Sequence, residues 1–145
     1  MKIKQISLFL ENKPGHLNAI CRTLAESGIN IVTLSLADTQ QFGIVRLIVE
    51  EWQKAKEVLE AAGYVVNVRE VVAAAVADRP GGMAEILDVI GKAGVNIEYM
   101  YAFTFRHGKE AVLVFRFDNP DRAIDALKTA GRDVLDAVAL FSKSK

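Results

Sequence analysis

The chain has 145 residues, of which 51% are hydrophobic and 25% are charged, a composition typical of a globular protein. Lysine plus arginine (18) equals aspartate plus glutamate (18), so the positive field that draws proteins to nucleic-acid phosphates is absent. No apolar run approaches the roughly 20 residues of a membrane-spanning helix, and no secretory leader is recognisable at the N-terminus. We therefore expect a cytoplasmic protein that binds neither nucleic acid nor membranes.

The first half of the chain alternates between strand and helix patterns. Ile6, Leu8 and Leu10 recur with the period of a half-buried strand. After Pro14 the apolar residues recur at three and four residues, as in an amphipathic helix, and Gly28 ends this helix. The predicted elements are a strand at Ile3–Leu10, a helix at Pro14–Gly28, strands at Ile29–Ala37 and Gly43–Val49 joined by a hairpin near Gln40, a helix at Trp52–Ala62 closed by Gly63, and a strand at Tyr64–Val68.

The second half repeats this order. Asn119 and Pro120 give a clear helix start, with Asn119 as the N-cap and Pro120 in the first helical position. The predicted elements are a strand at Val71–Ala77, a helix at Pro80–Ala93, strands at Val95–Arg106 and Glu110–Phe117, a helix at Pro120–Ala130 and a strand at Val134–Phe141.

The two halves form an internal repeat. Pro14 recurs as Pro80, an offset of 66, and Leu59 recurs as Leu127, an offset of 68, so the second copy contains a loop insertion of two residues between these positions. Two domains are expected, 1–70 and 71–145. Each has the order strand, helix, strand, strand, helix, strand, which with right-handed crossovers gives a four-stranded antiparallel sheet with both helices on one face. The predicted fold class is thus α+β, with two ferredoxin-like βαββαβ repeats.

The junction between the copies is predicted to be tight. Residues 65 to 76 are nearly continuous strand-forming sequence without glycine or proline, whereas a flexible tether would need small polar residues. The last strand of the first copy and the first strand of the second are therefore expected to lie close together.

The first strand-to-helix turn of each copy is the strongest candidate for chemistry. Pro14 and Pro80 suit the first helical position, and neither Lys13 nor Arg79 before them is a helix-capping residue. Uncapped helix starts carry partial positive charge and bind carboxylates. The amides expected to remain partly unsatisfied are those of Gly15, His16 and Leu17, and of Gly81, Gly82 and Met83.

Asn12 and Asp78 stand just before these turns and can accept a hydrogen bond from an ammonium group. A carboxylate site beside an ammonium site describes a free amino acid. The alternative is that Asn12 and Asp78 only bond their own backbone in a turn. Each turn is followed fifteen residues later by Asn30 or Asn96 within Gly-(Ile/Val)-Asn-Ile, and this second occurrence favours a ligand site.

Over essentially its whole length the chain resembles a tandem of ACT domains, most specifically at Asn12–Leu17 with Gly28–Ile31 and at Asp78–Met83 with Gly94–Ile97. These domains are small regulatory modules that bind amino acids beside many enzymes of amino-acid metabolism. The resemblance implies a ligand between two paired modules, contacted by the turn after the first strand and by the start of the second. Carried over by position, the implied ligand-binding residues are Asn12, Gly15, His16, Leu17, Asn30 and Ile31 in one copy, and Asp78, Gly81, Gly82, Met83, Asn96 and Ile97 in the other.

The resemblance also implies the partners: a small-molecule amino acid, a homodimer or other homo-oligomer, and a regulated enzyme in trans. The copies differ where a ligand would bind. The carboxylate of Asp78 should hold an ammonium more strongly than Asn12, and Gly82 should leave more room than His16. An interaction scaffold that binds no ligand is the alternative.

An aromatic ribbon, defined as Tyr99, Tyr101, Phe103 and Phe105, alternates along one predicted strand and so shares a sheet face. It is expected to fill core or interface volume. The alternatives are a pocket for an aromatic amino acid and base stacking in a single-strand RNA binder, although the neutral charge disfavours RNA.

Catalysis, cofactors and metals are not expected. Cys21 lies at helical spacing among apolar residues, and His16 and His107 belong to no cluster with metal-ligand spacing. No nucleophile elbow, P-loop or dinucleotide fingerprint is present. Arg79 stands near the position of the arginine of ferredoxin-like acylphosphatases, but their glycine-rich signature is missing, so Arg79 is expected to be solvated.

Overall fold

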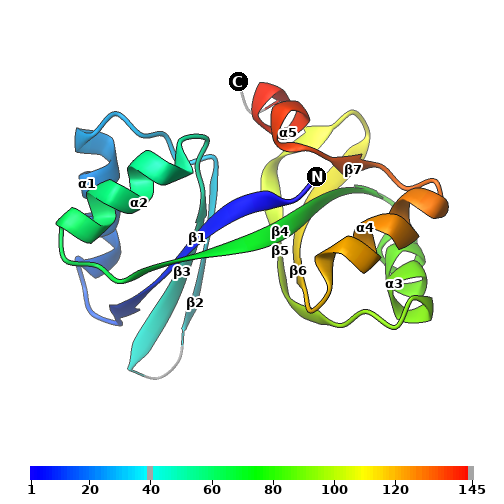
Figure 1. Cartoon of the computed structure of the whole chain (residues 1–145), viewed down its shortest axis with the longest axis horizontal. Helices are drawn as coiled ribbons and strands as arrows, with labels where there is room; N and C mark the ends of the chain where they lie inside the picture. The colour runs from blue at the N-terminus through cyan, green and yellow to red at the C-terminus, as the bar shows by residue number, and fades with distance from the viewer. Residues whose placement is uncertain (39–40, 144–145) are drawn as a thin grey trace. The chain divides into compact units, whose positions relative to one another are not determined.

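The computed structural model describes residues 1–38 and 41–143, without the side chains of Asp38, Phe105, His107 and Lys143. Its chain divides into two compact units (Figure 1). The first unit is Lys4–Arg69, and the second is Glu70–Lys145 together with Met1–Ile3.

The first unit contains an antiparallel sheet in the order β2-β3-β1-β4. β1 pairs with β3 from Ile6 opposite Leu47, and β2 pairs with β3 from Thr33 opposite Ile48. The predicted hairpin between these strands includes Gln40, which lies outside the described residues. The elements are β1 (Ile3–Glu11), α1 (His16–Glu26), β2 (Thr33–Asp38), β3 (Phe42–Ile48), α2 (Trp52–Ala61) and the beginning of β4 (Val66–Ala77).

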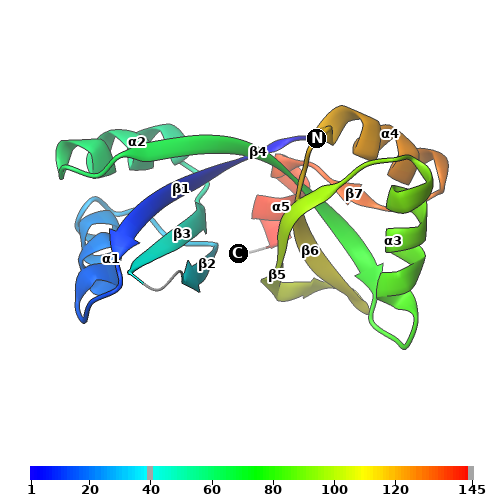
Figure 2. The ribbon, with the colours of Figure 1, turned by 90° about the horizontal axis from the view of Figure 1, so that it is seen from below.

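The two helices of the first unit cover one face of its sheet (Figure 2). The strand residues Ile6, Leu8 and Leu10 and the helix residues Ile20 and Leu24 share one buried apolar cluster. Alternation along the strand and three-to-four spacing along the helix place these side chains on facing surfaces. Gly28 and Gly63 follow the two helices with positive φ (71° and 95°), so the predicted glycine helix ends are confirmed.

The second unit has the same plan. Its sheet runs β4-β6-β5, and β7 pairs with the other edge of β4, where Ala74 lies opposite Val134. β4 and β6 are antiparallel, with Val72 opposite Phe115. The elements after β4 are α3 (Gly82–Lys92), β5 (Ile97–His107), β6 (Glu110–Phe117), α4 (Pro120–Thr129), β7 (Val134–Leu135) and α5 (Ala137–Lys143).

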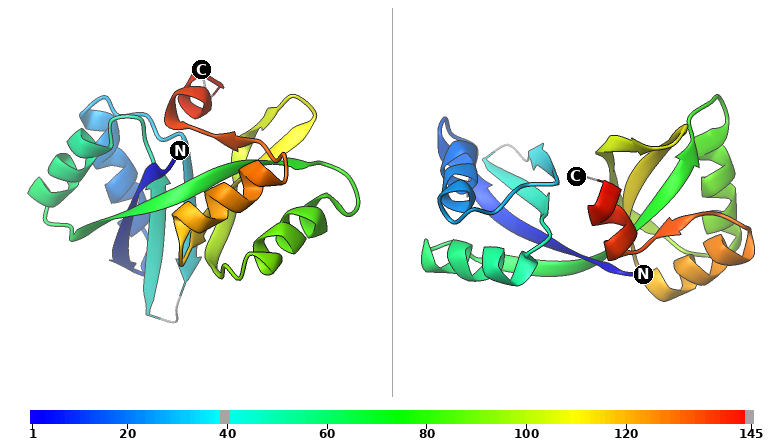
Figure 3. Two further views of the ribbon diagram at one scale, coloured as in Figure 1. Left: turned by 45° about the vertical axis from the view of Figure 1, so that its right-hand side comes forward. Right: turned by 90° about the horizontal axis from the view of Figure 1, so that it is seen from above.

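Helices α3 and α4 pack on one face of this second sheet (Figure 3). Phe115 and Phe117 stack with ring centroids 5.2 Å apart inside the buried cluster that also contains Ile86 and Leu127. The side chain of Asn119 accepts a hydrogen bond from the N–H of Arg122 (3.1 Å) at the start of α4, which confirms the predicted cap. The predicted α+β class with two ferredoxin-like βαββαβ repeats is confirmed.

One strand takes the place of two that the sequence predicts. The predicted strands Tyr64–Val68 and Val71–Ala77 form the single strand β4, which has 12 residues. Its residues 71–76 are buried, as expected for the apolar run in this segment. β4 is therefore the last strand of the first repeat and the first strand of the second.

The predicted strand Val134–Phe141 is wrong beyond Leu135. β7 has two residues, and the chain continues as α5. The carboxylate of Asp136 accepts a hydrogen bond from the N–H of Ala139 (2.7 Å), which is the geometry of a helix N-cap. This cap and the alanines that follow favour a helix, in which Leu140 is fully buried.

Candidate functional site

The first turn leaves the sheet where β1 ends at Glu11. The N–H of Asn12 donates to the carbonyl of Gln41 (3.0 Å), which ties the turn to the neighbouring strand β3. The ammonium of Lys13 lies 2.9 Å from the Glu11 carboxylate and lowers the pKa of that carboxyl, first through the hydrogen bond and then through its charge. The side chain of Asn12 is exposed beside this pair.

The start of α1 differs from the sequence prediction by two residues. Pro14 is not the first helical residue: Gly15 is the N-cap, with a left-handed φ of 88°, and α1 begins at His16. The N–H of His16 donates to the carbonyl of Lys13 (3.3 Å), so the expectation of an open amide is wrong there. The amides of Gly15 and Leu17 have no acceptor among the residues the structure describes, and no side chain caps the helix.

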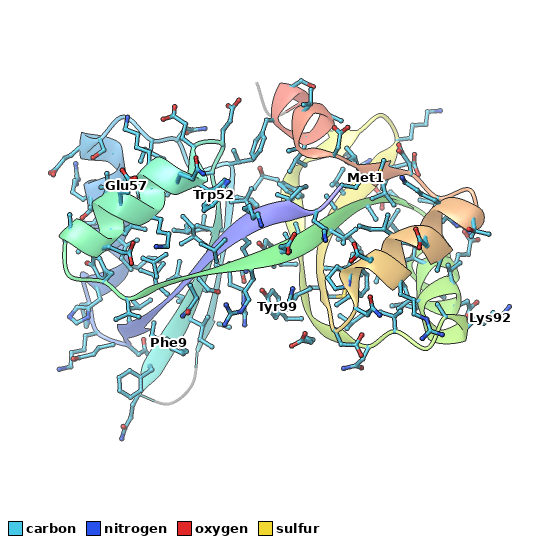
Figure 4. All side chains as sticks on the ribbon, in the orientation of Figure 1. Met1, Phe9, Trp52, Glu57, Lys92 and Tyr99 are labelled. Carbon is cyan, nitrogen blue, oxygen red and sulfur yellow. The ribbon has the colours of Figure 1, made fainter. Side chains whose placement is uncertain are left out.

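A cavity of about 320 Å³ adjoins this helix start. His16 and Ala19 of α1 form part of its wall, and the aromatic ring of Phe9, which is 61% exposed, lies at the end of β1 (Figure 4). The remaining lining residues are Leu10, Glu11 and Tyr64.

Sequence reasoning missed Phe9 and Tyr64 as site residues. An exposed aromatic at the polar position of an alternating strand was the available signal for Phe9. Of the predicted residues, His16 lines the cavity, whereas Leu17 and Ile31 pack against the buried cluster of the unit. Asn30 is exposed and does not line the cavity.

The second turn has the same backbone conformation as the first, but the first residue of its helix is more closely packed. Gly81 is the N-cap of α3, with φ 87°, and Pro80 again precedes it. The N–H of Gly82 donates to the carbonyl of Arg79 (3.0 Å), so this amide is also not open. The amides of Gly81 and Met83 find no acceptor within residues 1–38 and 41–143.

The charged groups of the second turn are engaged by the protein itself. The carboxylate of Asp78 forms an ion pair with Arg106 of β5. Arg79 is not simply solvated: its guanidinium lies 2.6 Å from the carboxylate of Glu85, and this hydrogen bond lowers the pKa of Glu85. An ammonium group arriving at Asp78 must therefore compete with Arg106.

Gly82 leaves no spare room for a ligand. A Cβ at this position would lie 1.9 Å from the carbonyl oxygen of Ala77, so the glycine is required for the packing of α3 against the end of β4. Asn96 exchanges two hydrogen bonds with Asp118, its N–H donating to the carboxylate (3.0 Å) and its carbonyl accepting from the Asp118 N–H (3.1 Å). Met83 and Ile97 pack against the buried cluster of the second unit.

The aromatic ribbon lies on β5, with Tyr99 opposite Arg116 and Tyr101 opposite Val114. Tyr99 is labelled in Figure 4. Phe103 is buried, at 8% exposure, so the expected core-filling role is confirmed for this residue. Tyr99 and Tyr101 are half-buried. The side chain of Phe105 lies outside the described part of the structure.

Among the described residues, no three His, Cys, Asp or Glu side chains gather in a geometry that could hold a metal ion. None of the described helices combines the length and apolarity required to cross a bilayer.

Comparison with known proteins agrees with this architecture. Protein BT0572 from Bacteroides thetaiotaomicron has a solved structure that is 38% identical, covers 97% of this chain and 96% of that one, and superposes with a TM-score of 0.90. The regulatory subunit of aspartate kinase from Thermus thermophilus, in its ligand-free form, is 21% identical, covers 88% of this chain and 91% of that one, and has a TM-score of 0.65. The corresponding subunit from Thermus flavus is 20% identical, covers 88% and 92%, and has a TM-score of 0.60.

No functionally curated protein gives a significant sequence match. A family model described as the ACT domain pair matches residues 1–143, nearly the whole chain. This match shows that the chain belongs to the ACT domain pair family.

Proposed function

We propose that this chain is a non-catalytic regulatory protein that binds a free amino acid at the start of α1. The observation that carries the proposal is the uncapped helix start beside a cavity of about 320 Å³. A helix N-terminus attracts a carboxylate, and a cavity of this size suits the side chain of an amino acid. Family membership supports a regulatory role.

Each part of the ligand has a candidate partner in the first repeat. The amides of Gly15 and Leu17 donate to the ligand carboxylate, and the absence of a Cβ on Gly15 permits close approach. The side-chain oxygen of Asn12 accepts from the ammonium group. Phe9 and Tyr64 provide the apolar wall for the ligand side chain. A ligand of roughly 10 to 15 heavy atoms at about 0.5 kcal/mol per atom would bind with a Kd of about 1 to 100 μM.

The proposal ranks the first repeat above the second. The sequence alone favours Asp78 over Asn12 for an ammonium group, because a carboxylate is the stronger acceptor. In the structure Arg106 already forms an ion pair with that carboxylate. Displacing Arg106 costs binding free energy, so the neutral but exposed Asn12 becomes the better partner.

For ligand binding to have a regulatory effect, this chain must act on a second protein or change its own self-association. Ligand binding changes an equilibrium only if the ligand has different affinities for the two states. The solved relatives from Thermus are regulatory subunits of aspartate kinase. By analogy with them, we propose that this chain acts on an enzyme of amino-acid metabolism in trans; self-association into a homo-oligomer is the other proposed route.

Titration of the purified chain with the twenty amino acids, by thermal shift and then by calorimetry, tests the proposal. At least one amino acid should raise the melting temperature and bind with micromolar affinity. Asn12→Ala should weaken that binding by about tenfold, since a hydrogen bond to a charged group contributes about 1.5 kcal/mol. Asp78→Ala should change it by less than about twofold.

Two results would count against this assignment. A lack of response to all twenty amino acids would leave the ligand-free scaffold as the better reading. A larger effect of Asp78→Ala than of Asn12→Ala would move the site to the second repeat. Arg106→Met provides a further check, because releasing Asp78 from its ion pair should increase binding at the second turn.

Catalysis and RNA binding are weaker candidates. An acylphosphatase needs its turn arginine for the substrate, whereas the guanidinium of Arg79 is held by Glu85. Base stacking needs exposed ring faces, and Phe103 is buried. An acyl-phosphate hydrolysis assay and a single-strand binding measurement at low salt are both expected to be negative.

A further inference from the structure

A second cavity, of about 570 Å³, lies on the second unit between α4 and the last turn of α3, at the far end of α3 from the turn at Gly81. We call it the α3–α4 groove. Its floor is apolar and made of small side chains, including Ala93, Ala126 and Ala130. Small residues on both helices leave space that larger ones would fill, and this volume is within the range of about 300–1,000 Å³ for small-molecule sites.

Three charged groups line the groove: Lys92 of α3, and Arg122 and Asp125 of α4. None of the three forms an ion pair with a described residue. Arg122 reaches the end of α3, since a Cβ on Gly94 would lie 4.0 Å from its guanidinium, and Lys92 stands in the last turn of the same helix. Lys92 extends outward from α3 (Figure 4). Both cations thus stand near the C-terminal end of α3.

The first repeat provides an internal comparison for these charges. The repeat offset of 66 matches Lys92 with Glu26, which reverses the charge. The offset of 68 matches Arg122 with Lys54, whose ammonium lies 3.8 Å from Glu51.

The floor differs between the repeats as well. The offset of 68 matches Ala126 with Val58, and the offset of 66 matches Ala93 with Ser27. Both changes make the α1–α2 pair less suited to an apolar body, one by adding volume and the other by adding a hydroxyl. The combination of unpaired cations with a floor of alanines thus belongs to the second repeat.

We propose that the α3–α4 groove binds acids that carry one carboxylate on a short apolar body. The carboxylate is held by Lys92 and Arg122 through charge-assisted hydrogen bonds, and the body lies on the alanine floor. Asp125 disfavours ligands with a second negative charge. The site is independent of the starts of α1 and α3, because it uses neither the Pro-Gly turns nor an ammonium group on the ligand.

Three probes with the same apolar body test the charge requirement: 4-phenylbutyrate, 4-phenylbutylamine and 4-phenylbutanol. Each is added to the ¹⁵N-labelled full chain while the backbone amide shifts are followed. The acid should shift amides of α3 and α4 and saturate with a Kd of about 1 mM. The amine and the alcohol should bind at least about tenfold more weakly, because they lack the charge that the two cations attract.

Variants on the same helices locate the site. Lys92→Glu and Arg122→Glu should each weaken 4-phenylbutyrate by about tenfold, because each replaces attraction by repulsion near the surface. Ala126→Val should weaken it by filling the floor, and it should fold because the first repeat carries Val58 at the matching position. Lys128→Glu is the matched control: it makes the same charge change on α4 outside the groove and should leave the Kd unchanged.

Four results would overturn the proposal. The first is equal binding of the alcohol or the amine, and the second is saturating shifts on α1 and α2 in place of α3 and α4. The third is an unchanged Kd in both Lys92→Glu and Arg122→Glu. The fourth is the absence of any shift at about 10 mM acid, ten times the expected Kd.

Discussion

Single residues decide how the two helix starts differ. At the first, His16 opens α1 and lines a cavity; at the second, Gly82 opens α3 and is buried against β4. The repeat pattern aligns these positions but does not show which neighbour each one meets. The guanidinium of Arg106 reaches Asp78 only through the fold, and the contact of the Ala77 carbonyl with Gly82 depends on the exact path of the turn, so the sequence predicts neither.

Gly82→Ala should destabilise the protein strongly. Its new Cβ would lie 1.9 Å from the carbonyl oxygen of Ala77, and relieving that overlap requires α3 or β4 to move. We expect the free energy of unfolding to fall by about 2–4 kcal/mol in urea denaturation. Gly91→Ala in the same helix is the control. Space is open at this position, and alanine favours a helix more than glycine does, so the free energy of unfolding should rise by about 0.5–1 kcal/mol. Equal effects of the two substitutions would refute the packing role.

The secondary-structure elements were largely predictable, because each amphipathic stripe and each glycine helix end is a local signal. The four long helices and the hairpin strands follow from them. The exceptions are β4, where two predicted strands are one, and α5, where a two-residue strand gives way to a helix. β4 is continuous because it pairs with strands of both repeats, and these partners are distant in the sequence. α5 depends on the cap at Asp136, and the apolar pattern of residues 134–141 does not reveal that cap.

Helix caps give a test at this scale. Asn119 accepts the hydrogen bond from Arg122 at the start of α4, whereas Glu51, the N-cap of α2, makes no such bond. Asn119→Ala should therefore lower the free energy of unfolding by about 1 kcal/mol. Glu51→Ala should change it by less than about 0.5 kcal/mol, because its ion pair with Lys54 is exposed. Chemical denaturation of both variants measures the difference, and a cost at Glu51 as large as at Asn119 would contradict the assigned caps.

Across the whole molecule, positive and negative side chains are equal in number, and several of them form exposed ion pairs. Glu11 pairs with Lys13, and Glu85 pairs with Arg79 and, at 3.5 Å, with Arg132. Both carboxyl groups have their pKa lowered, first by the hydrogen bond from the nearest cation. Composition alone predicts the neutral balance but not which charges meet, since Glu85 and Arg132 are far apart in the chain.

These pairs should make stability fall in acid. A carboxyl with a lower pKa in the folded state stabilises the fold above its unfolded pKa, and this stabilisation is lost as the pH falls through the folded value. The unfolding midpoint in urea should therefore drop below about pH 4.5, the ordinary value for glutamate. Glu85→Gln should flatten this drop.

The control for the pH experiment is Glu57→Gln. Glu57 is exposed on α2 and forms no ion pair with any described residue (Figure 4). Its replacement should leave the pH dependence as in the unmodified protein. Identical pH curves for Glu85→Gln and the unmodified chain would argue that the Glu85 pairs contribute nothing to folding.

The strand common to both repeats limits how the polypeptide can be dissected. A break after Glu70 leaves the N-terminal fragment with only the opening of β4, and a break after Ala77 removes from the C-terminal fragment the strand that lies between β6 and β7. A chimaera that exchanges one repeat for a homologous one must therefore take β4 from one of its two parents. The strands that come from the other parent then pair with a β4 of different sequence. Modular swapping, routine for domains joined by linkers, would here need compensating substitutions along that ladder.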